Sequence, residues 1–246
     1  MDRLLYVAMN GAKHSFNQQA VTAQNLANAS TVGYKSQNSA FRALPVIGPG
    51  VATRTFVVDS TPNADLSSGA IFTTGRPQDI AVHGQGWIAV QDAKGAEAYT
   101  RNGSLQVTSD GLLMTSTGLP VIGDGGPITI PSDSEITIGK DGTVSVVTNN
   151  QYNATTNLAR IKLVNPMDAD MVRGDDGLFR TSNKQPAVAD ANVNLVAGAL
   201  ESSNVNSVGA LVSIIEQSRF FDIQVQLMQK ADENANRALQ LMTLGA

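Results

Sequence analysis

The chain has 246 residues, a formal net charge of −4, and only 15% charged residues. Soluble domains average about 25% charged residues, so this composition favours association with other protein surfaces. The sequence has no long basic or acidic run, and we therefore expect no nucleic-acid partner and no anionic-membrane partner. It also contains no cysteine, which excludes disulfides and thiolate metal sites.

The first residues do not read as a cleaved secretory signal. Met1 to Met9 include Asp2 and Arg3 and lack an apolar core of about 7 to 15 residues. No later run approaches the roughly 18 apolar residues of a membrane-spanning helix. We therefore expect no cleaved signal peptide and no transmembrane segment.

Residues 3 to about 28 are predicted to form one long helix. The segment lacks proline, and its apolar residues recur at steps of three or four. Its polar residues are mostly Asn and Gln, which can be buried if each finds a hydrogen-bond partner, and we expect other protein to surround this helix. The stripe consists of Leu5, Met9, Ala12, Phe16, Ala20, Ala23 and Ala27.

The middle of the chain has the short β-branched runs and the turn residues that are typical of β structure. Residues 36 to 78 carry four prolines among short extended runs, which indicates a partly extended linker. Residues 79 to 200 contain short β-branched runs separated by Asp-Gly dipeptides, which favour tight hairpin turns. We expect a mainly antiparallel β domain there.

Helical periodicity returns after Asn206 and continues for nearly forty residues. A helix of this length cannot bury its whole apolar seam on a small β domain, and we expect it to pair with the N-terminal helix of its own chain, of neighbouring copies, or both. Asp232, at a seam position, is either a register-setting polar residue, the interpretation that we favour, or a residue that turns toward solvent near the end of the chain.

These observations predict an α+β fold, in which long N- and C-terminal helices pair as a coiled-coil-like axial domain around an inserted, mainly antiparallel β domain. The expected segments are residues 1–35, 36–78, 79–200 and 201–246. We further expect that the terminal helices are poorly ordered in the isolated chain and become ordered on assembly.

Three groups of motifs carry a family resemblance. Asn25-Leu26-Ala27-Asn28, followed by Thr31 and Gly33-Tyr34-Lys35, strongly resembles the signature of flagellar rod and hook proteins. The middle motifs Asp79 to Val82, Gly84 to Trp87, Tyr99 to Gly103 and Gly126 to Pro131 resemble the β domain of the same family, and Glu201, Ser203 to Asn206 and Arg219 to Asp222 resemble its C-terminal segment.

The resemblance implies a structural subunit of the bacterial flagellar basal-body rod. The short chain, the Met-Asp start and Ala52 to Thr55 look most like the proximal-rod member of the family, with the distal-rod member or another axial protein as the alternative. The resemblance also implies torque transmission in a rod that crosses the periplasm, contacts with further copies and with proximal and distal rod neighbours, and passage through the flagellar export apparatus without a cleaved signal.

The bulky members of the two stripes are the candidate assembly interface, because a self-assembling subunit polymerises through its apolar seams. They are Leu5, Met9, Phe16, Leu26 and Asn28 in the first segment, and Leu211, Ile214, Ile215, Phe221, Val225, Met228 and Leu239 in the last. Asn28 and Thr31 also suit a plain role as helix-end and turn residues.

No catalytic, cofactor or metal site is predicted, and we expect neither an enzyme nor a small-molecule substrate. Gly84 to Ala89 fits G-x-G-x-x-A, but a strand pattern follows where a dinucleotide site needs a helix. His14 and His83 have no partner at metal-ligand spacing. The acidic residues between Asp168 and Asp176 lack a calcium-loop pattern, and no nucleophile motif is present.

Two other classes of function remain open from the sequence. A carbohydrate-binding or hydrolytic β domain with oligomerising tails would use Trp87, the single tryptophan, as a stacking platform. Such a protein is expected to have several exposed aromatics and a carboxylate pair, whereas aromatic residues make up only 5% of this chain. A surface adhesin would need the secretory signal that this start lacks.

Overall fold

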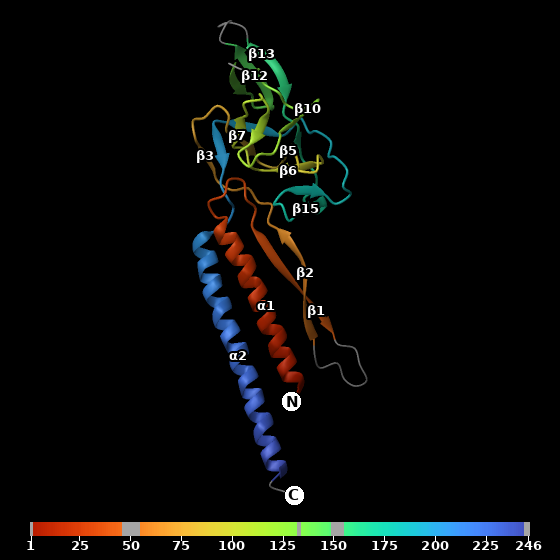
Figure 1. Cartoon of the computed structure of the whole chain (residues 1–246), viewed down its shortest axis with the longest axis vertical. Coiled ribbons are helices and arrows are strands. Elements are labelled where there is room, and N and C mark those ends of the chain that lie inside the picture. The colour runs from red at the N-terminus through yellow and green to blue at the C-terminus, as the bar shows by residue number, and fades with distance from the viewer. Residues whose placement is uncertain (1, 46–54, 132–133, 149–154, 244–246) are drawn as a thin grey trace. The chain divides into compact units, whose positions relative to one another are not determined.

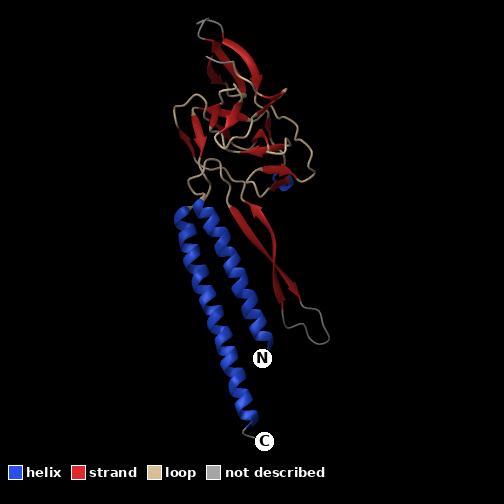
Figure 2. Cartoon of the chain, in the orientation of Figure 1, coloured by secondary structure: helices blue, strands red, loops and turns tan. Residues whose placement is uncertain are grey.

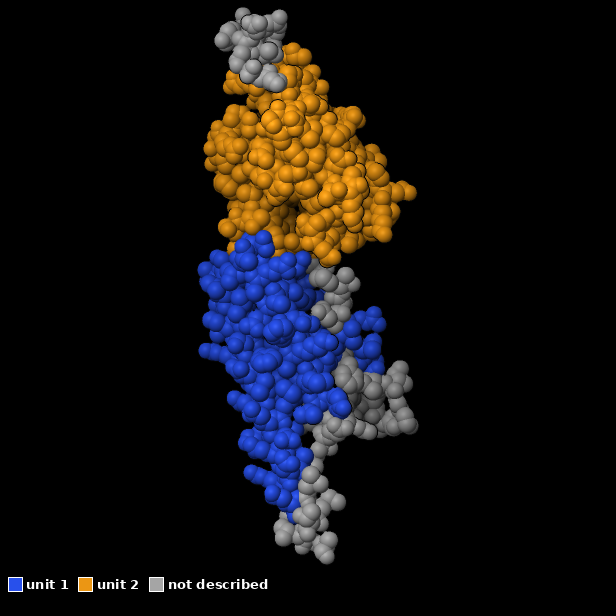
Figure 3. Space-filling view, in the orientation of Figure 1, with its two compact units in different colours: residues 1–28, 37–63, 205–246 blue, residues 29–36, 64–204 orange. Residues whose placement is uncertain are grey.

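The computed structural model describes residues 2–45, 55–131, 134–148 and 155–243. The chain divides into two compact units, each assembled from separate stretches of sequence (Figure 3). Residues 1–28, 37–63 and 205–246 form the first, here called the helical unit, and residues 29–36 and 64–204 form the second, the β unit. Both the segment after the first helix and the segment before the last helix therefore belong to the β unit.

Two long helices dominate the helical unit. Helix α1 spans Asp2–Ala27 and helix α2 spans Ser207–Thr243. They lie side by side, as the red and blue ends of the chain show in Figure 1. The predicted pairing of long terminal helices is thus confirmed. Within the described residues, no helix combines the length and apolarity needed to cross a membrane.

Small side chains form the contact of α1 with α2. Ala8, Ala12 and Ser15 are buried on α1, and Ser15 Oγ donates a hydrogen bond to the Gln217 carbonyl at 2.7 Å. A Cβ atom added to Gly11 would meet the Gln224 side chain at 3.0 Å. Small residues allow two helix backbones to approach closely. This seam runs beside the predicted stripe of α1 and shares Ala12 with it.

A two-stranded hairpin completes the helical unit (Figure 2). Strand β1 spans Gln37–Pro45 and strand β2 spans Thr55–Ala64, within the segment expected to be a partly extended linker. His14 of α1 contacts both strands: its Nε2 lies 2.8 Å from the Val57 carbonyl oxygen, and its ring meets Phe41 edge-on with centroids 5.5 Å apart. The hairpin is therefore anchored to α1.

The β unit consists of short strands whose described pairings are all antiparallel. Its largest sheet has the order β14-β5-β6-β16-β15, and a second has the order β11-β12-β13. The other described strands of this unit form the pairs β17-β4, β18-β3, β7-β8 and β10-β9. The antiparallel β domain expected in the middle of the chain is confirmed.

The strand bounds follow the chain through the β unit, with one short 3-10 helix, η1, at Asp168–Asp170. The strands are β3 Ile71–Thr73, β4 Ile80–His83, β5 Trp87–Gln91, β6 Glu97–Thr100, β7 Leu105–Val107, β8 Leu113–Thr115, β9 Ile122–Gly123, β10 Gly126–Pro127, β11 Ser134–Ile138, β12 Thr143–Thr148, β13 Thr155–Arg160, β14 Leu163–Val164, β15 Met171–Arg173, β16 Phe179–Thr181, β17 Asn194–Ala197 and β18 Ala199–Glu201.

The core of the β unit is aliphatic. Ile80, Ile88 and Val144 are fully buried members of the main cluster, and a second cluster collects Trp87, Tyr99 and Phe179. Burying a side chain of this size stabilises a fold by about 1.5–3 kcal/mol. The β unit thus has the larger core, whereas the helical unit buries mainly small side chains.

Candidate functional site

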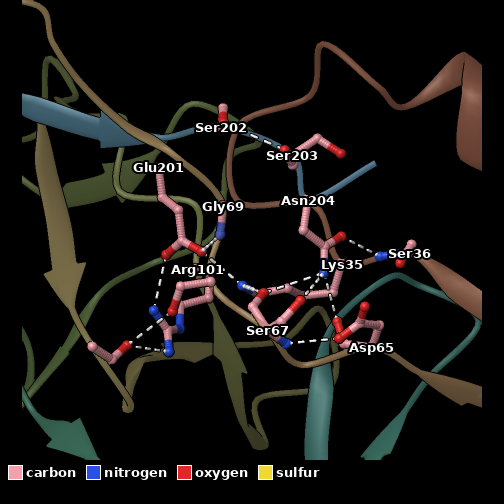
Figure 4. Close-up of polar contacts among 12 residues, drawn as sticks. Lys35, Ser36, Asp65, Ser67, Gly69, Arg101, Glu201, Ser202, Ser203 and Asn204 are labelled. Atoms are coloured by element: carbon pink, nitrogen blue, oxygen red, sulfur yellow. Dashed lines mark hydrogen bonds and ion pairs between the residues drawn. The ribbon is translucent and has the colours of Figure 1, made fainter. Parts of the chain in front are cut away.

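Three residues from separate sequence motifs meet in the interior of the β unit (Figure 4). Lys35 ends the motif after α1, Arg101 follows β6, and Glu201 ends β18. Their exposed fractions are 1%, 3% and 0%. Three charged side chains are thus completely removed from water.

Glu201 is the centre of this cluster. Its Oε1 accepts hydrogen bonds from Lys35 Nζ at 2.6 Å and from the Gly69 backbone N–H at 2.9 Å. Its Oε2 accepts from Arg101 Nη1 at 2.9 Å. Lys35 Nζ also donates to the Ser67 carbonyl at 2.7 Å. Both carboxylate oxygens are therefore paired, as a buried charge requires.

Arg101 extends the cluster to the aromatic core. Its Nη2 donates to the Gly84 carbonyl at 2.8 Å, and its guanidinium carbon lies 5.2 Å from the centre of the Trp87 ring. Trp87 is 2% exposed, and its ring centroid lies 4.5 Å from that of Phe179. Trp87 is therefore an internal support for Arg101, and the idea that it is a stacking platform for a sugar is wrong.

The cluster combines two cations with one anion. Burial lowers the pKa of Lys35, while the hydrogen bond and the negative charge of Glu201 act in the opposite direction. Removing one partner of a buried ion pair leaves an uncompensated charge and typically costs about 3–5 kcal/mol. Both carboxylate oxygens of Glu201, the Lys35 ammonium and both terminal nitrogens of Arg101 have protein partners, and only Arg101 Nε is buried without one. The arrangement suits a structural lock.

Backbone contacts show which segments the lock holds together. The Gly33 N–H donates to the Glu201 carbonyl at 2.8 Å, and the Asn204 N–H donates to the Tyr34 carbonyl at 3.3 Å. The Asn204 side chain accepts from the Ser36 N–H and donates to the Asp65 carbonyl, both at 2.8 Å. The segment that follows α1 and the segment that precedes α2 are thus bound side by side.

Gly33 is required at this junction for two reasons. Its φ of +68° lies in the left-handed region that side chains rarely adopt. A Cβ at this position would also lie 2.3 Å from the carbonyl carbon of Arg101. The absence of a side chain at Gly33 therefore allows the segment after α1 to lie directly against the backbone of Arg101.

Several residues of the site had no signal in the sequence. Arg173 Nη1 donates to the Lys35 carbonyl at 2.9 Å, and its guanidinium carbon lies 4.6 Å from the centre of the Tyr34 ring. The pKa of Asp65 is lowered, chiefly by hydrogen bonds from Ser67. A solitary basic or acidic residue in a β-rich segment belongs to no motif, so only the folded structure identifies these partners.

The predicted assembly residues all belong to the helical unit, whose first stretch ends at Asn28. Leu5, Met9 and Phe16 are 39%, 52% and 62% exposed, and Leu211 and Ile215 are 51% and 53% exposed. The side chain of Leu239 lies outside the described residues. The half-buried members are Leu26, Asn28, Ile214, Phe221, Val225 and Met228.

The remaining candidates contribute no reactive centre. Trp87 begins strand β5, which follows the Gly84-Gln85-Gly86 turn, so the helix of a dinucleotide site is missing there. His14 belongs to the helical unit and His83 to the β unit. Asp176 pairs with Arg180 at 2.6 Å. Among the described residues, no group of three potential ligands is placed to hold a metal ion.

Three protein-family models match the chain. The model described as "Flagella basal body rod protein" matches residues 5–35. The model "Flagellar hook protein FlgE/F/G D1 domain" matches residues 81–146. The model "Flagellar basal body rod FlgEFG protein C-terminal" matches residues 196–241. Lys35, Arg101 and Glu201 fall one in each of the three matched regions.

Curated relatives match over nearly the full chain. The flagellar basal-body rod protein FlgF of Escherichia coli is 46% identical, over 99% of this chain and 100% of the relative. FlgF of Caulobacter vibrioides is 34% identical, over 98% of both chains. FlgG of Buchnera aphidicola is less similar, with 27% identity over 96% of this chain and 98% of the relative.

Proposed function

Because this chain belongs to the FlgF family of flagellar basal-body rod proteins and is a structural subunit of the rod, we propose that it polymerises through the outward faces of its two long helices. Assembly with other rod components follows from the family. The proposal concerns the surface that makes those contacts and the mechanical role of the polymer.

The observation that carries the proposal is the exposure of apolar side chains on α1 and α2. Each helix packs on the other, yet Met9, Phe16 and Ile215 remain 52%, 62% and 53% exposed. A helix with apolar residues on more than one face is normally buried on those faces. Burial against neighbouring subunits provides the missing contacts.

Packed helices also suit a shaft that transmits motor torque. Contacts that repeat head-to-tail and do not close into a ring generate a helical polymer. In this proposal the α1 and α2 helices form the axial contacts, and the Lys35–Glu201–Arg101 lock keeps the chain segments next to both helices together under load. A non-enzymatic role is consistent with a charge cluster whose carboxylate oxygens are both bound by protein groups.

The finer location follows from the family resemblance. We propose that this subunit belongs to the proximal rod, contacts further copies and neighbouring proximal and distal rod proteins, and lies in a rod that crosses the periplasm. We also propose delivery by the flagellar export apparatus without a cleaved signal. Mass spectrometry of the protein from purified basal bodies tests the last point, since a mature chain that lacks its first residues would contradict it.

The substitution Ile215→Glu tests the helical interface. A charge at this position should block rod assembly and motility, because it would be buried without a partner between subunits. The circular dichroism spectrum of the purified chain should stay unchanged, because the position is exposed in the single chain. Gln226→Glu is the matched control, since it adds the same charge at an exposed polar position of α2. Normal rods and motility with Ile215→Glu would contradict the proposal.

A further inference from the structure

A hollow of about 270 Å³ lies within the helical unit, where α1, the β1–β2 hairpin and α2 come together. Among the described residues that line it, none is Asp, Glu, Lys or Arg. An uncharged lining favours an uncharged occupant, because a charge would lose its hydration without gaining a partner. The side chains that give the hollow its character are Val7, Gly11, His14, Phe41, Val57 and Phe220.

The hollow exposes apolar surface in the single chain. Val7, Phe41, Val57 and Phe220 are 46%, 39%, 40% and 49% exposed, and all four line it. Exposed apolar residues that are scattered singly need no explanation, but a group gathered on one concave surface marks an interaction site.

Phe16 lies on the opposite side of α1. Successive residues of a helix are rotated by about 100°, so position 16 points roughly half a turn away from positions 7, 11, 14 and 18. All four of those positions line the hollow. Phe16 is 62% exposed, more than any other described aromatic side chain. The same helix thus carries an unpaired aromatic side chain on one face and an unfilled apolar hollow on the other.

We propose that the hollow receives Phe16 of a neighbouring copy of this chain. The inference rests on the proposed function and deepens it, because it names the contact between subunits. A protrusion and a hollow on opposite faces form a heterologous contact that leaves both ends open, which is the geometry of a helical polymer. Phe16 of each copy fills the hollow of the next.

The charge distribution favours a second copy as the occupant. Residues 1–34 contain only Asp2, Arg3 and Lys13 as charged residues. Lys13 is the one charged residue of α1 close to Phe16, and the lining of the hollow has none, so bringing two copies together places no like charges opposite each other at this contact. Gly11 and Gln224 both line the hollow, and a Cβ added to Gly11 would come within 3.0 Å of the Gln224 side chain.

Cysteine crosslinking tests this contact directly, because the chain has no native cysteine. Ala20→Cys places a thiol one turn from Phe16, and Val57→Cys places one at the hollow, while Phe16 itself is kept. In basal bodies from cells whose only copy is the double variant, mild oxidation should produce disulfide-linked multimers of this chain. The control pair is Ala20→Cys with Gln226→Cys, which is exposed on α2 and does not line the hollow.

The crosslinking outcomes separate this inference from the proposed function. Multimers with the Val57 pair and only background with the Gln226 pair support the contact. Multimers with the Gln226 pair alone overturn it, while copies still pack through their helices. Links from the Val57 thiol to a different rod protein, or no link with either pair, also overturn the contact, whereas the proposed function is judged separately by Ile215→Glu.

A second substitution asks whether Phe16 supplies the affinity. Added to the Val57 pair, Phe16→Ala should lower the crosslinking yield roughly tenfold, as expected for losing one buried aromatic side chain. Phe16→Leu should retain most of the yield, and Tyr6→Ala, at a position 52% exposed on α1, should leave it unchanged. Equal effects of Phe16→Ala and Tyr6→Ala would overturn the inference.

Discussion

Lys35 Nζ and Glu201 Oε1 lie 2.6 Å apart, with both side chains fully buried and their positions 166 apart in sequence. The contact joins the segment after α1 to the segment before α2 within the β unit. Because Arg101 binds the other carboxylate oxygen, Glu201 is the residue through which three distant parts of the chain are connected.

Replacing Glu201 should therefore destabilise the β unit more than any exposed change. Glu201→Gln leaves Lys35 and Arg101 without their counter-charge, and we expect the free energy of unfolding to fall by about 3–5 kcal/mol. Trp87, the single tryptophan, is 2% exposed and reports unfolding by fluorescence in urea. Glu135→Gln, an identical change at an exposed strand position, should leave the midpoint within error. Equal midpoints for both variants would contradict the lock.

Gly33→Ala tests the backbone junction. The variant places a methyl group against the Arg101 backbone and also forces alanine to adopt a φ of +68°. Gly118→Ala is the matched control, since its φ is +83° but nothing lies within 4 Å of the added Cβ. The control should lose about 1–2 kcal/mol from backbone strain alone, and Gly33→Ala clearly more. The same urea titration measures both, and equal losses would show that the close approach is unimportant.

The ion pairs of Arg180 predict a pH dependence. Hydrogen bonds from Arg180 are the main cause that lowers the pKa of both Asp92 and Asp176. A lowered carboxyl pKa stabilises the fold above the unfolded value of about 3.9, and this contribution is lost as the pH falls through the lowered values. Arg180→Met should therefore lower the unfolding midpoint at pH 7. The difference in midpoint between this variant and the unmodified chain should become smaller near pH 3.

Lys140→Met is the control for the Arg180 experiment, because it removes one exposed positive charge from the same unit. The unfolding midpoint of Lys140→Met should differ little from that of the unmodified chain at both pH values. A gap for Arg180→Met that stays constant between pH 7 and pH 3 would show that the two carboxyls do not contribute through their ionised forms.

Hydrogen exchange should distinguish the two units in the isolated chain. Helix α1 buries mainly Ala8, Ala12 and Ser15, whereas four of the five residues of β5 are buried. Because little buried apolar surface opposes local opening, amides of residues 5–27 should exchange much faster than those of β5 and become protected in assembled rods. Equal protection of α1 and β5 in the monomer would contradict the expected ordering on assembly.

Periodicity was sufficient to predict the long helices but not the face by which they pair. The predicted stripe on α1 ran through Leu5, Met9, Ala12 and Phe16 to three further alanines, whereas the intrachain seam follows Ala8, Ala12 and Ser15 and shares only Ala12 with it. A spacing of three or four residues is satisfied by more than one face of an alanine-rich helix, so side-chain size alone does not identify the face. The partner helix selects the seam that permits the closest approach.

The candidate site, in contrast to the helices, could not be predicted from local sequence patterns. Lys35, Arg101 and Glu201 were each singled out only as parts of family-like motifs, and nothing in their spacing places them together. Their contact depends on how strands far apart in the sequence pair with one another, which no local pattern encodes. Arg173 and Asp65 had no signal at all because each acts through a single long-range partner.

The sequence by itself determined the elements of this protein, two long helices around an antiparallel β segment, because helix and strand periods and turn residues are local properties of the chain. Only the tertiary structure decided that Glu201 joins Lys35 to Arg101 and that Phe16 remains outside the seam of α1. Both results depend on which surfaces come into contact. Those contacts form where the energy gained by packing exceeds the cost of removing water from the groups that become buried.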